Sequence, residues 1–194
     1  MRKGKVTRKT KETDVTVEIV LNGSGVTKIN TQIPFLNHML DLMGKHGLFD
    51  LTVEATGDIE VDYHHLMEDV GLTLGAAIAK ALGTKEGITR FGSALVPMDE
   101  SLSEVIIDLS GRPYMVYNVP GGDYTLRDLQ VSLFEDFFRG VSNNGLFNLH
   151  VRLHYGRDTH HMIEAIFKAF GRALSEAVST DPRVKGVPST KGSL

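Results

Sequence analysis

One short histidine-rich motif occurs twice in the chain, at positions 96 residues apart. Its copies read His64-His65-Leu66-Met67-Glu68 and His160-His161-Met162-Ile163-Glu164, so half of the eight histidines belong to an HHxxE pattern. On a helix, residues three and four positions apart share a face, whereas adjacent residues point about 100° apart. Each glutamate can therefore lie beside a histidine of its own motif, but two neighbouring imidazoles cannot easily bind one ion. The pattern predicts two sets of metal ligands.

The similarity between the two parts of the chain extends beyond this motif. Gly47-Leu48-Phe49 matches Gly145-Leu146-Phe147 at an offset of 98 residues, and at the same offset His38 corresponds to Asp136. A half of about 95 residues buries little core by itself, so an internal duplication is the economical explanation. We predict one catalytic unit, residues 1–194, made of two repeats of about 1–92 and 93–180 and followed by a loop-like tail, 181–194.

Hydrophobic periodicity predicts strands and helices in the same order in both repeats. Apolar and polar residues alternate over 15–21, which predicts a strand. The alternation breaks at the turn-forming residues 22–25, so we expect residues 26–31 to form a second strand that pairs with the first as a hairpin. The other predicted strands are 48–55, 103–109, 114–119 and 147–153. The predicted helices are 35–46, 64–82, 126–141 and 160–178. The predicted fold class is α+β, an internally duplicated half-domain in which each half is a mostly antiparallel sheet with two helices on one face.

Composition excludes several classes of function. The chain is 41% hydrophobic and 23% charged, which is ordinary for a globular protein, and its net charge of −3 argues against nucleic-acid binding. The basic residues near the start are interpreted as a solvated strand. There is no apolar run long enough for a bilayer and no signal-peptide pattern, so we expect a cytoplasmic protein without a membrane partner. Without cysteines, a metal must be held by imidazole and carboxylate groups, which suits Mn, Fe, Co or Zn.

The chain resembles the imidazoleglycerol-phosphate dehydratase family from end to end. The matching stretches, besides the two motifs, include Phe35 to Asp41, His46 to Leu51, Pro97 to Glu100, Leu109 to Tyr114, Phe167 to Phe170 and Pro188 to Gly192. The resemblance implies a lyase of histidine biosynthesis that converts imidazoleglycerol phosphate to imidazole-acetol phosphate and water. It also implies two Mn²⁺ ions per active site and a homo-oligomer of 24 subunits with active sites between subunits.

The resemblance also divides the predicted ligands between two ions. One ion would take His38, His65, His160 and Glu164, and the other would take His64, Glu68, Asp136 and His161. The two sets interchange under the duplication. Many family members carry histidine where this chain has Asp136, and a carboxylate there can bind Mn²⁺ directly, bind it through water or not bind it.

Substrate-binding residues are also carried over from the family. Six residues match phosphate-binding positions of the family, three of them in the tail: Arg90, Arg112, Lys168, Ser189, Thr190 and Lys191. Two further residues, Glu12 and His46, match other substrate contacts. Only Lys168, one turn past Glu164 on the same helical face, is placed near the metals by spacing as well. Candidate proton carriers are Glu164, Glu68, Glu12 and Asp99, and their order stays open.

The expected chemistry is the loss of a hydroxyl group from the carbon beside an imidazole ring. A ring held as an imidazolate can expel that hydroxyl through a diazafulvene-like intermediate, and loss of a carbon-bound proton then gives an enol that becomes the ketone. Two alternatives use the same ligands: a dinuclear phosphoester hydrolase, and a non-catalytic metal that joins subunits. His150 and His154, which share one strand face, are interpreted as packing or hydrogen-bonding residues.

Overall fold

Alternating branched residues build the centre of the first sheet. The computed structural model describes residues 2–120 and 124–194. In β2 (Thr13–Val20), Val15, Val17 and Ile19 are fully buried, while the residues between them are partly exposed. This strand lies between β1 (Lys3–Lys9) and β4 (Asp50–Gly57), and β3 (Thr27–Asn30) follows β4 at the far edge. All pairs are antiparallel except β3 with β4, which are parallel.

The second half repeats this plan. Its sheet has the order β5-β6-β10-β7, formed by β5 (Phe91–Met98), β6 (Ser101–Asp108), β10 (Asn148–Tyr155) and β7 (Tyr114–Asn118). Again only the last pair, β10 with β7, is parallel. The predicted α+β fold with two similar halves is confirmed. The predicted boundary near residue 92 lies at the start of β5.

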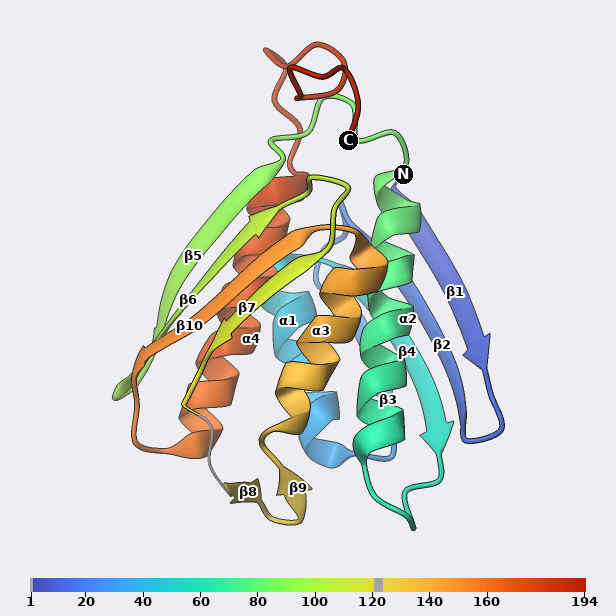
Figure 1. Ribbon diagram of the computed structural model, residues 1–194, viewed down its shortest axis with the longest axis vertical. Helices are drawn as coiled ribbons and strands as arrows, with labels where there is room; N and C mark the ends of the chain where they lie inside the picture. Colours follow the sequence, from blue (N-terminus) through green and yellow to red (C-terminus); the bar gives the residue numbers. More distant parts are fainter. Residues whose placement is uncertain (1, 121–123) are drawn as a thin grey trace.

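Four helices of the described residues lie between the two sheets (Figure 1). They are α1 (Pro34–Gly47), α2 (His64–Leu82), α3 (Leu133–Gly145) and α4 (Thr159–Val178). α2 packs on β1 and β2, and α4 packs on β5 and β6. Across the halves, α1 packs against α4 and α2 against α3, so each helix pair contains one helix of each repeat. Buried phenylalanines of α3 and α4 fill the centre.

Two glycines at equivalent positions let the edge strands approach the helices closely. A Cβ atom at Gly4 in β1 would lie 2.0 Å from the carbonyl oxygen of Ala77 in α2. A Cβ atom at Gly92 in β5 would lie 2.0 Å from the carbonyl oxygen of Ala173 in α4. Only a residue without a side chain fits at such a distance, so the duplication has kept glycine at both contacts.

The predicted hairpin between 15–21 and 26–31 is wrong. The neighbour of β2 is β1, and β3 pairs instead with β4 in register from Thr27 opposite Leu51. The turn carries the chain across the start of β4, where the backbone N–H groups of Ser24 and Val26 donate to the Asp50 carboxylate. Parallel strands need a helical crossover, and β3-α1-β4 supplies one.

The predicted helix 126–141 is also corrected, because α3 begins only at Leu133. Before it, β8 (Thr125–Leu126) and β9 (Leu129–Gln130) form a small hairpin whose turn holds Arg127 at a positive φ of 63°. The first half has only three residues between β3 and α1, so this β8–β9 hairpin has no counterpart there. β5 was not predicted from the sequence. The other predicted helices and strands are confirmed to within about three residues at each end.

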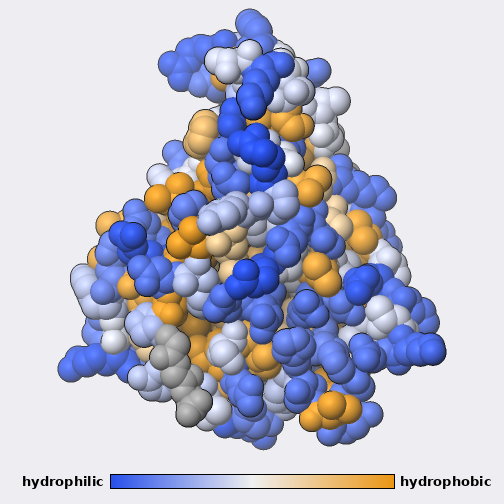
Figure 2. Space-filling view, in the orientation of Figure 1, coloured by the Kyte–Doolittle hydropathy of each residue, from blue (hydrophilic) through white to orange (hydrophobic). Residues whose placement is uncertain are grey.

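All four helices begin at the end of the molecule that carries the β8–β9 hairpin, whereas the tail and the C-terminus lie at the opposite end (Figure 1). Figure 2 shows hydrophilic residues over most of the visible surface of the tail. As predicted, 181–194 contain neither helix nor strand. None of the helices in the described parts of the chain is both long and apolar enough to cross a bilayer.

Candidate metal centre

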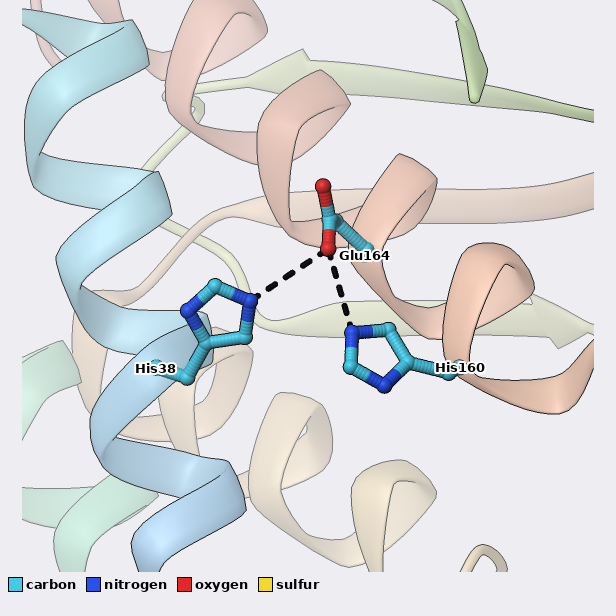
Figure 3. A group of neighbouring side chains, drawn as sticks. All are labelled: His38, His160 and Glu164. Carbon is cyan, nitrogen blue, oxygen red and sulfur yellow. Dashed lines mark hydrogen bonds and ion pairs between the residues drawn. The ribbon is translucent and has the colours of Figure 1, made fainter. Parts of the chain in front are cut away.

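The contact between α1 and α4 brings together three of the predicted metal ligands. His38 comes from the start of α1, and His160 and Glu164 come from the start of α4, where Asp158 caps the helix by accepting from the N–H of His160. The Nε2 atoms of His38 and His160 each lie 3.3 Å from Oε2 of Glu164 (Figure 3). One ligand atom from each residue lies within 4.8 Å of the others. Two imidazole nitrogens and one carboxylate oxygen are a donor set that suits a divalent transition metal.

Glu164 is buried, and its two oxygens have different partners. While Oε2 faces the imidazoles, Oε1 lies 2.6 Å from Nζ of Lys168, whose ammonium also lies 3.3 Å from the sulfur of Met98. Desolvation is the largest single influence on the pKa of Glu164 and raises it, but Lys168 and His38 together outweigh it, so the pKa is lowered. The carboxylate is therefore held in its ionised form, which is the form that binds metal.

The repeat image of this cluster lies between α2 and α3 and is looser. Nδ1 of His64 lies 3.8 Å from Oδ2 of Asp136, the image of His38. Glu68, the image of Glu164, is exposed on α2. The duplicated ligands thus form two groups, each with one helix from each repeat. We call them the α1–α4 cluster (His38, His160, Glu164) and the α2–α3 cluster (His64, Glu68, Asp136). Among the described residues, only His38, His160 and Glu164 bring three ligand atoms within 4.8 Å of one another, and no contact joins the side chain of Glu68 to His64 or Asp136.

The remaining two histidines of the motifs face the tips of the strand hairpins. Nδ1 of His161 lies 2.8 Å from Glu100, and its Nε2 lies 3.9 Å from Asp99. The hydrogen bond to Glu100 is the main cause of the raised pKa of His161. Such a carboxylate partner on one ring nitrogen orients the other nitrogen and makes it a stronger metal ligand. Within one chain, however, His161 does not join the α2–α3 cluster to which its predicted set belongs.

His65 has a similar environment on the other half. Its Nδ1 lies 3.1 Å from Asp58 and 3.9 Å from Glu12, and the hydrogen bond to Asp58 is the main cause of its raised pKa. Sequence reasoning missed both Asp58 and Glu100. The duplication could have indicated Glu100, because it lies 88 residues after Glu12, and the same offset relates Gly92 to Gly4.

Lys168 and His46 are the predicted substrate contacts near the α1–α4 cluster. His46 lies in the last turn of α1, and its pKa is lowered by desolvation and then by the positive charges of Lys168 and Arg172. Arg172, one turn beyond Lys168 on α4, was not predicted from the sequence. These three side chains form a basic strip along the α1–α4 contact.

The other predicted phosphate-binding residues lie at the tail end of the chain. Arg90 makes two hydrogen bonds to Asp108, at 2.7 and 3.2 Å, and donates a third to the carbonyl oxygen of Pro188 at 2.9 Å. The guanidinium of Arg112 donates to the carbonyl oxygen of the nearby Ser110, at 3.4 Å, and the backbone carbonyl oxygen of Arg112 accepts from the side chain of Asn148. Ser189, Thr190 and Lys191 belong to the tail itself. A helix of the length of α2 spans about 28 Å, so these residues are far from the metal clusters of their own chain.

A pocket of about 600 Å³ adjoins the α1–α4 cluster. His38 and His160 form part of its wall, and the segment 32–35, Tyr63 and the β8–β9 hairpin form the rest. The hydroxyl of Tyr63 donates to Asp128 and ties the hairpin to the start of α2. On the second sheet, His154 donates a hydrogen bond to the Glu104 carboxylate at 3.0 Å, as its interpretation as a hydrogen-bonding residue requires, while His150 is exposed.

Comparison with known proteins identifies the family. The model of the imidazoleglycerol-phosphate dehydratase family matches residues 31–174. The imidazoleglycerol-phosphate dehydratases of Geobacter metallireducens and Bacillus subtilis are 51% and 50% identical to the chain; each alignment covers 100% of the chain and at least 99% of the relative. The crystal structure of the Staphylococcus aureus enzyme aligns with a TM-score of 0.83 at 36% identity, covering 92% of this chain and 99% of that one.

A crystal structure of the enzyme from Pyrococcus furiosus, in complex with (S)-C348, also aligns with a TM-score of 0.83. It is 38% identical and covers 97% of this chain and 100% of that one. The sequence relatives cover the whole chain, and the two solved structures cover 92% and 97% of it. The chain therefore belongs to the imidazoleglycerol-phosphate dehydratase family, the hydro-lyases of histidine biosynthesis.

Proposed function

We propose that the chain dehydrates imidazoleglycerol phosphate to imidazole-acetol phosphate and water at a dinuclear manganese site that binds the substrate ring as an imidazolate. The observation that carries this proposal is the convergence of His38, His160 and Glu164, with both Nε2 atoms 3.3 Å from one carboxylate oxygen. Three protein donors leave coordination positions free for a substrate, as a catalytic site needs.

The proposed ions have different ligands. His38, His160 and Glu164 would hold one, and His64, Glu68 and Asp136 would contribute to the other. Bound there, the metals would supply Lewis acidity that stabilises the substrate ring as an imidazolate, and the negative charge of that ring would assist loss of the neighbouring hydroxyl group. With a carboxylate in place of one imidazole, the α2–α3 cluster should favour Mn²⁺ over Zn²⁺ more strongly than the α1–α4 cluster does.

The side chains around the clusters supply the proton transfers. A carboxylate must take the carbon-bound proton, and a proton must reach the departing hydroxyl so that it leaves as water. Glu164 and Glu68 lie in the clusters, and Glu12 and Asp99 lie 3.9 Å from His65 and His161. Since the carboxylates of Glu12 and Asp99 are much more exposed than that of Glu164, they are the better candidates for exchanging protons with solvent.

We further propose that complete sites form between subunits of a homo-oligomer of 24 chains. His65 and His161 contact Asp58 and Glu100 rather than the ligands of either cluster of their own chain. Arg90, Arg112 and the tail lie at the opposite end of the molecule from the HHxxE motifs. A site that uses His65 together with His38, and the tail together with Lys168, therefore needs more than one copy of the chain. The tail residues Ser189, Thr190 and Lys191 would then bind the phosphate group of a substrate held by a neighbouring subunit.

The activity is tested with imidazoleglycerol phosphate after removal of bound metal and after addition of Mn²⁺. We expect Mn²⁺ to restore the ultraviolet absorbance of the enolised ketone product. Glu164→Gln should abolish it, whereas Glu176→Gln, at the far end of the same helix, should not. Release of inorganic phosphate, or full activity without any metal, would contradict the proposal.

The assembly is tested separately by light scattering before and after treatment with EDTA. If ions join ligands from different chains, chelation should reduce the size of the particle. A large particle that keeps its size after complete metal removal would mean that metal does not hold the subunits together.

A further inference from the structure

The repeat gives Glu164 a partner that its image lacks. Lys168 lies one turn after Glu164, and its ammonium contacts Oε1 at 2.6 Å. At the equivalent position after Glu68 the chain has Leu72, which cannot form an ion pair. Both Lys168 and Glu164 are largely removed from solvent, with 15% and 9% of their side chains exposed. An ion pair with so little contact with water is weakly screened, so its charges act strongly on their neighbours.

The same contrast holds for the residues around this pair. Arg172 corresponds to Ala76, and His46 corresponds to Asn144. The α1–α4 cluster therefore has one carboxylate beside two permanent positive charges, whereas the α2–α3 cluster has two carboxylates and no lysine or arginine at the equivalent positions. The charges of the α2–α3 cluster therefore favour binding of a divalent cation, whereas those around the α1–α4 cluster oppose it.

We propose that Lys168 couples anion binding to cation binding in the α1–α4 cluster. Without an anion, its ammonium occupies Oε1 of Glu164 and repels an incoming cation. A phosphate-like dianion bound along the basic strip of Lys168, Arg172 and His46 neutralises this repulsion and draws the ammonium away from Glu164. The carboxylate is then free for the cation, so each ligand strengthens the binding of the other.

This coupling deepens the proposed function, on which it rests, by assigning Lys168 a positioning role in addition to contact with the phosphate group of the substrate. The substrate carries its phosphate and its imidazole on one molecule. Binding of the phosphate would therefore complete the cation site at the moment when the ring arrives. The α2–α3 cluster, which has no such lysine, would hold its cation independently of the anion.

The experiment measures binding rather than turnover. Free Mn²⁺ is followed by its electron paramagnetic resonance signal during titration of the metal-free protein, with and without sulfate as the dianion. In the wild type, sulfate should raise the Mn²⁺ affinity of one class of sites by about 5- to 150-fold, the usual range for coupled ligands. By thermodynamic linkage, Mn²⁺ should raise the affinity for sulfate by the same factor, which can be measured without any variant.

Lys168→Met should raise the Mn²⁺ affinity of the coupled sites in the absence of sulfate and remove the effect of sulfate. Lys80→Met is the matched control, because Lys80 is an exposed lysine near the far end of α2 that donates to the carbonyl oxygen of Lys5. It should leave both affinities unchanged. The coupling is overturned if sulfate has no effect on Mn²⁺ binding in the wild type, or if its effect survives in Lys168→Met. A protein that dehydrates the substrate with Mn²⁺ but lacks coupling would refute this inference alone, whereas a protein that binds no Mn²⁺ would refute the proposed function as well.

Discussion

Arg90 connects the tail to the second sheet, and its replacement should release the tail. Its guanidinium is fixed by two hydrogen bonds to Asp108 and donates the third to the carbonyl oxygen of Pro188, and only 16% of its side chain is exposed. A hydrogen bond from a charged donor contributes about 1.5–3 kcal/mol. Since about 1.4 kcal/mol is a factor of ten, Arg90→Met should increase the detached population of the tail roughly 10- to 150-fold.

Limited digestion with trypsin measures this population, because Arg183, Lys185 and Lys191 are cleavage sites within the tail. When opening and closing are fast, the cleavage rate follows the fraction of open molecules. Arg112→Met is the matched control, since it removes the same charge near the same end of the molecule but loses only a local contact. Equal cleavage rates in Arg90→Met and Arg112→Met would refute the role of Arg90 as an anchor of the tail.

Three further predictions follow from the geometry. Gly92→Ala should lower the free energy of unfolding by about 1–3 kcal/mol in urea titrations, because the new Cβ would lie 2.0 Å from a backbone oxygen of α4, while Ser93→Ala should change it by less than about 0.5 kcal/mol. If Asp136 binds a cation, Asp136→Ala should weaken Mn²⁺ binding at one site, and Asp136→His should shift the preference of that site toward Zn²⁺ in metal titrations. Equal affinities of both sites in the wild type and the two variants would show that Asp136 does not bind metal. Because Glu100 raises the pKa of His161, protons should compete with Mn²⁺ at a higher pH than for an ordinary histidine, and Glu100→Gln should move the pH midpoint of Mn²⁺ binding downward. In the metal-free protein, this ion pair stabilises the fold while Glu100 is ionised and His161 is protonated. Its stabilisation is therefore complete just below about pH 6.5, the pKa of an unfolded histidine, and is lost as pH rises through the folded pKa of His161, which urea titrations on both sides of that range would detect.

The helices of the fold were predictable from sequence where one face is continuously apolar. The boundaries of α2 follow directly from its apolar residues at spacings of four and from Gly83 at its end. The position of β3 was not predictable in the same way, because alternation states which face of a strand is buried but not which strand lies beside it. The β8–β9 hairpin escaped prediction because its strands contain only two residues each, too few for any period to appear.

The members of the metal clusters were also predictable only in part, because spacing along one helix does not show which other element packs against it. The spacing of HHxxE places Glu164 on the same helical face as His160, and the structure agrees. The meeting with His38 depends on the contact between α1 and α4, which no spacing in the sequence indicates. The resemblance to the family, and not the spacing, placed His38 in the same ligand set. The carboxylate partner of His161 comes from a hairpin tip 61 residues away, and no local pattern relates those two positions.

Fusion of two repeats explains how similar motifs can come to serve different purposes. In a symmetric dimer of separate half-units, both clusters would be identical, because the same surface occurs on both subunits. In a single chain, each half can change alone. Here the second half has the β8–β9 hairpin beside the α1–α4 cluster, whereas the first half does not, and Lys168 stands where the first half has Leu72. Because each repeat contributes one helix to each cluster, a substitution on one helix alters only the cluster to which that helix belongs. The pseudo-twofold frame can therefore keep two sets of metal ligands while confining the positive charge needed for an anion to one of them.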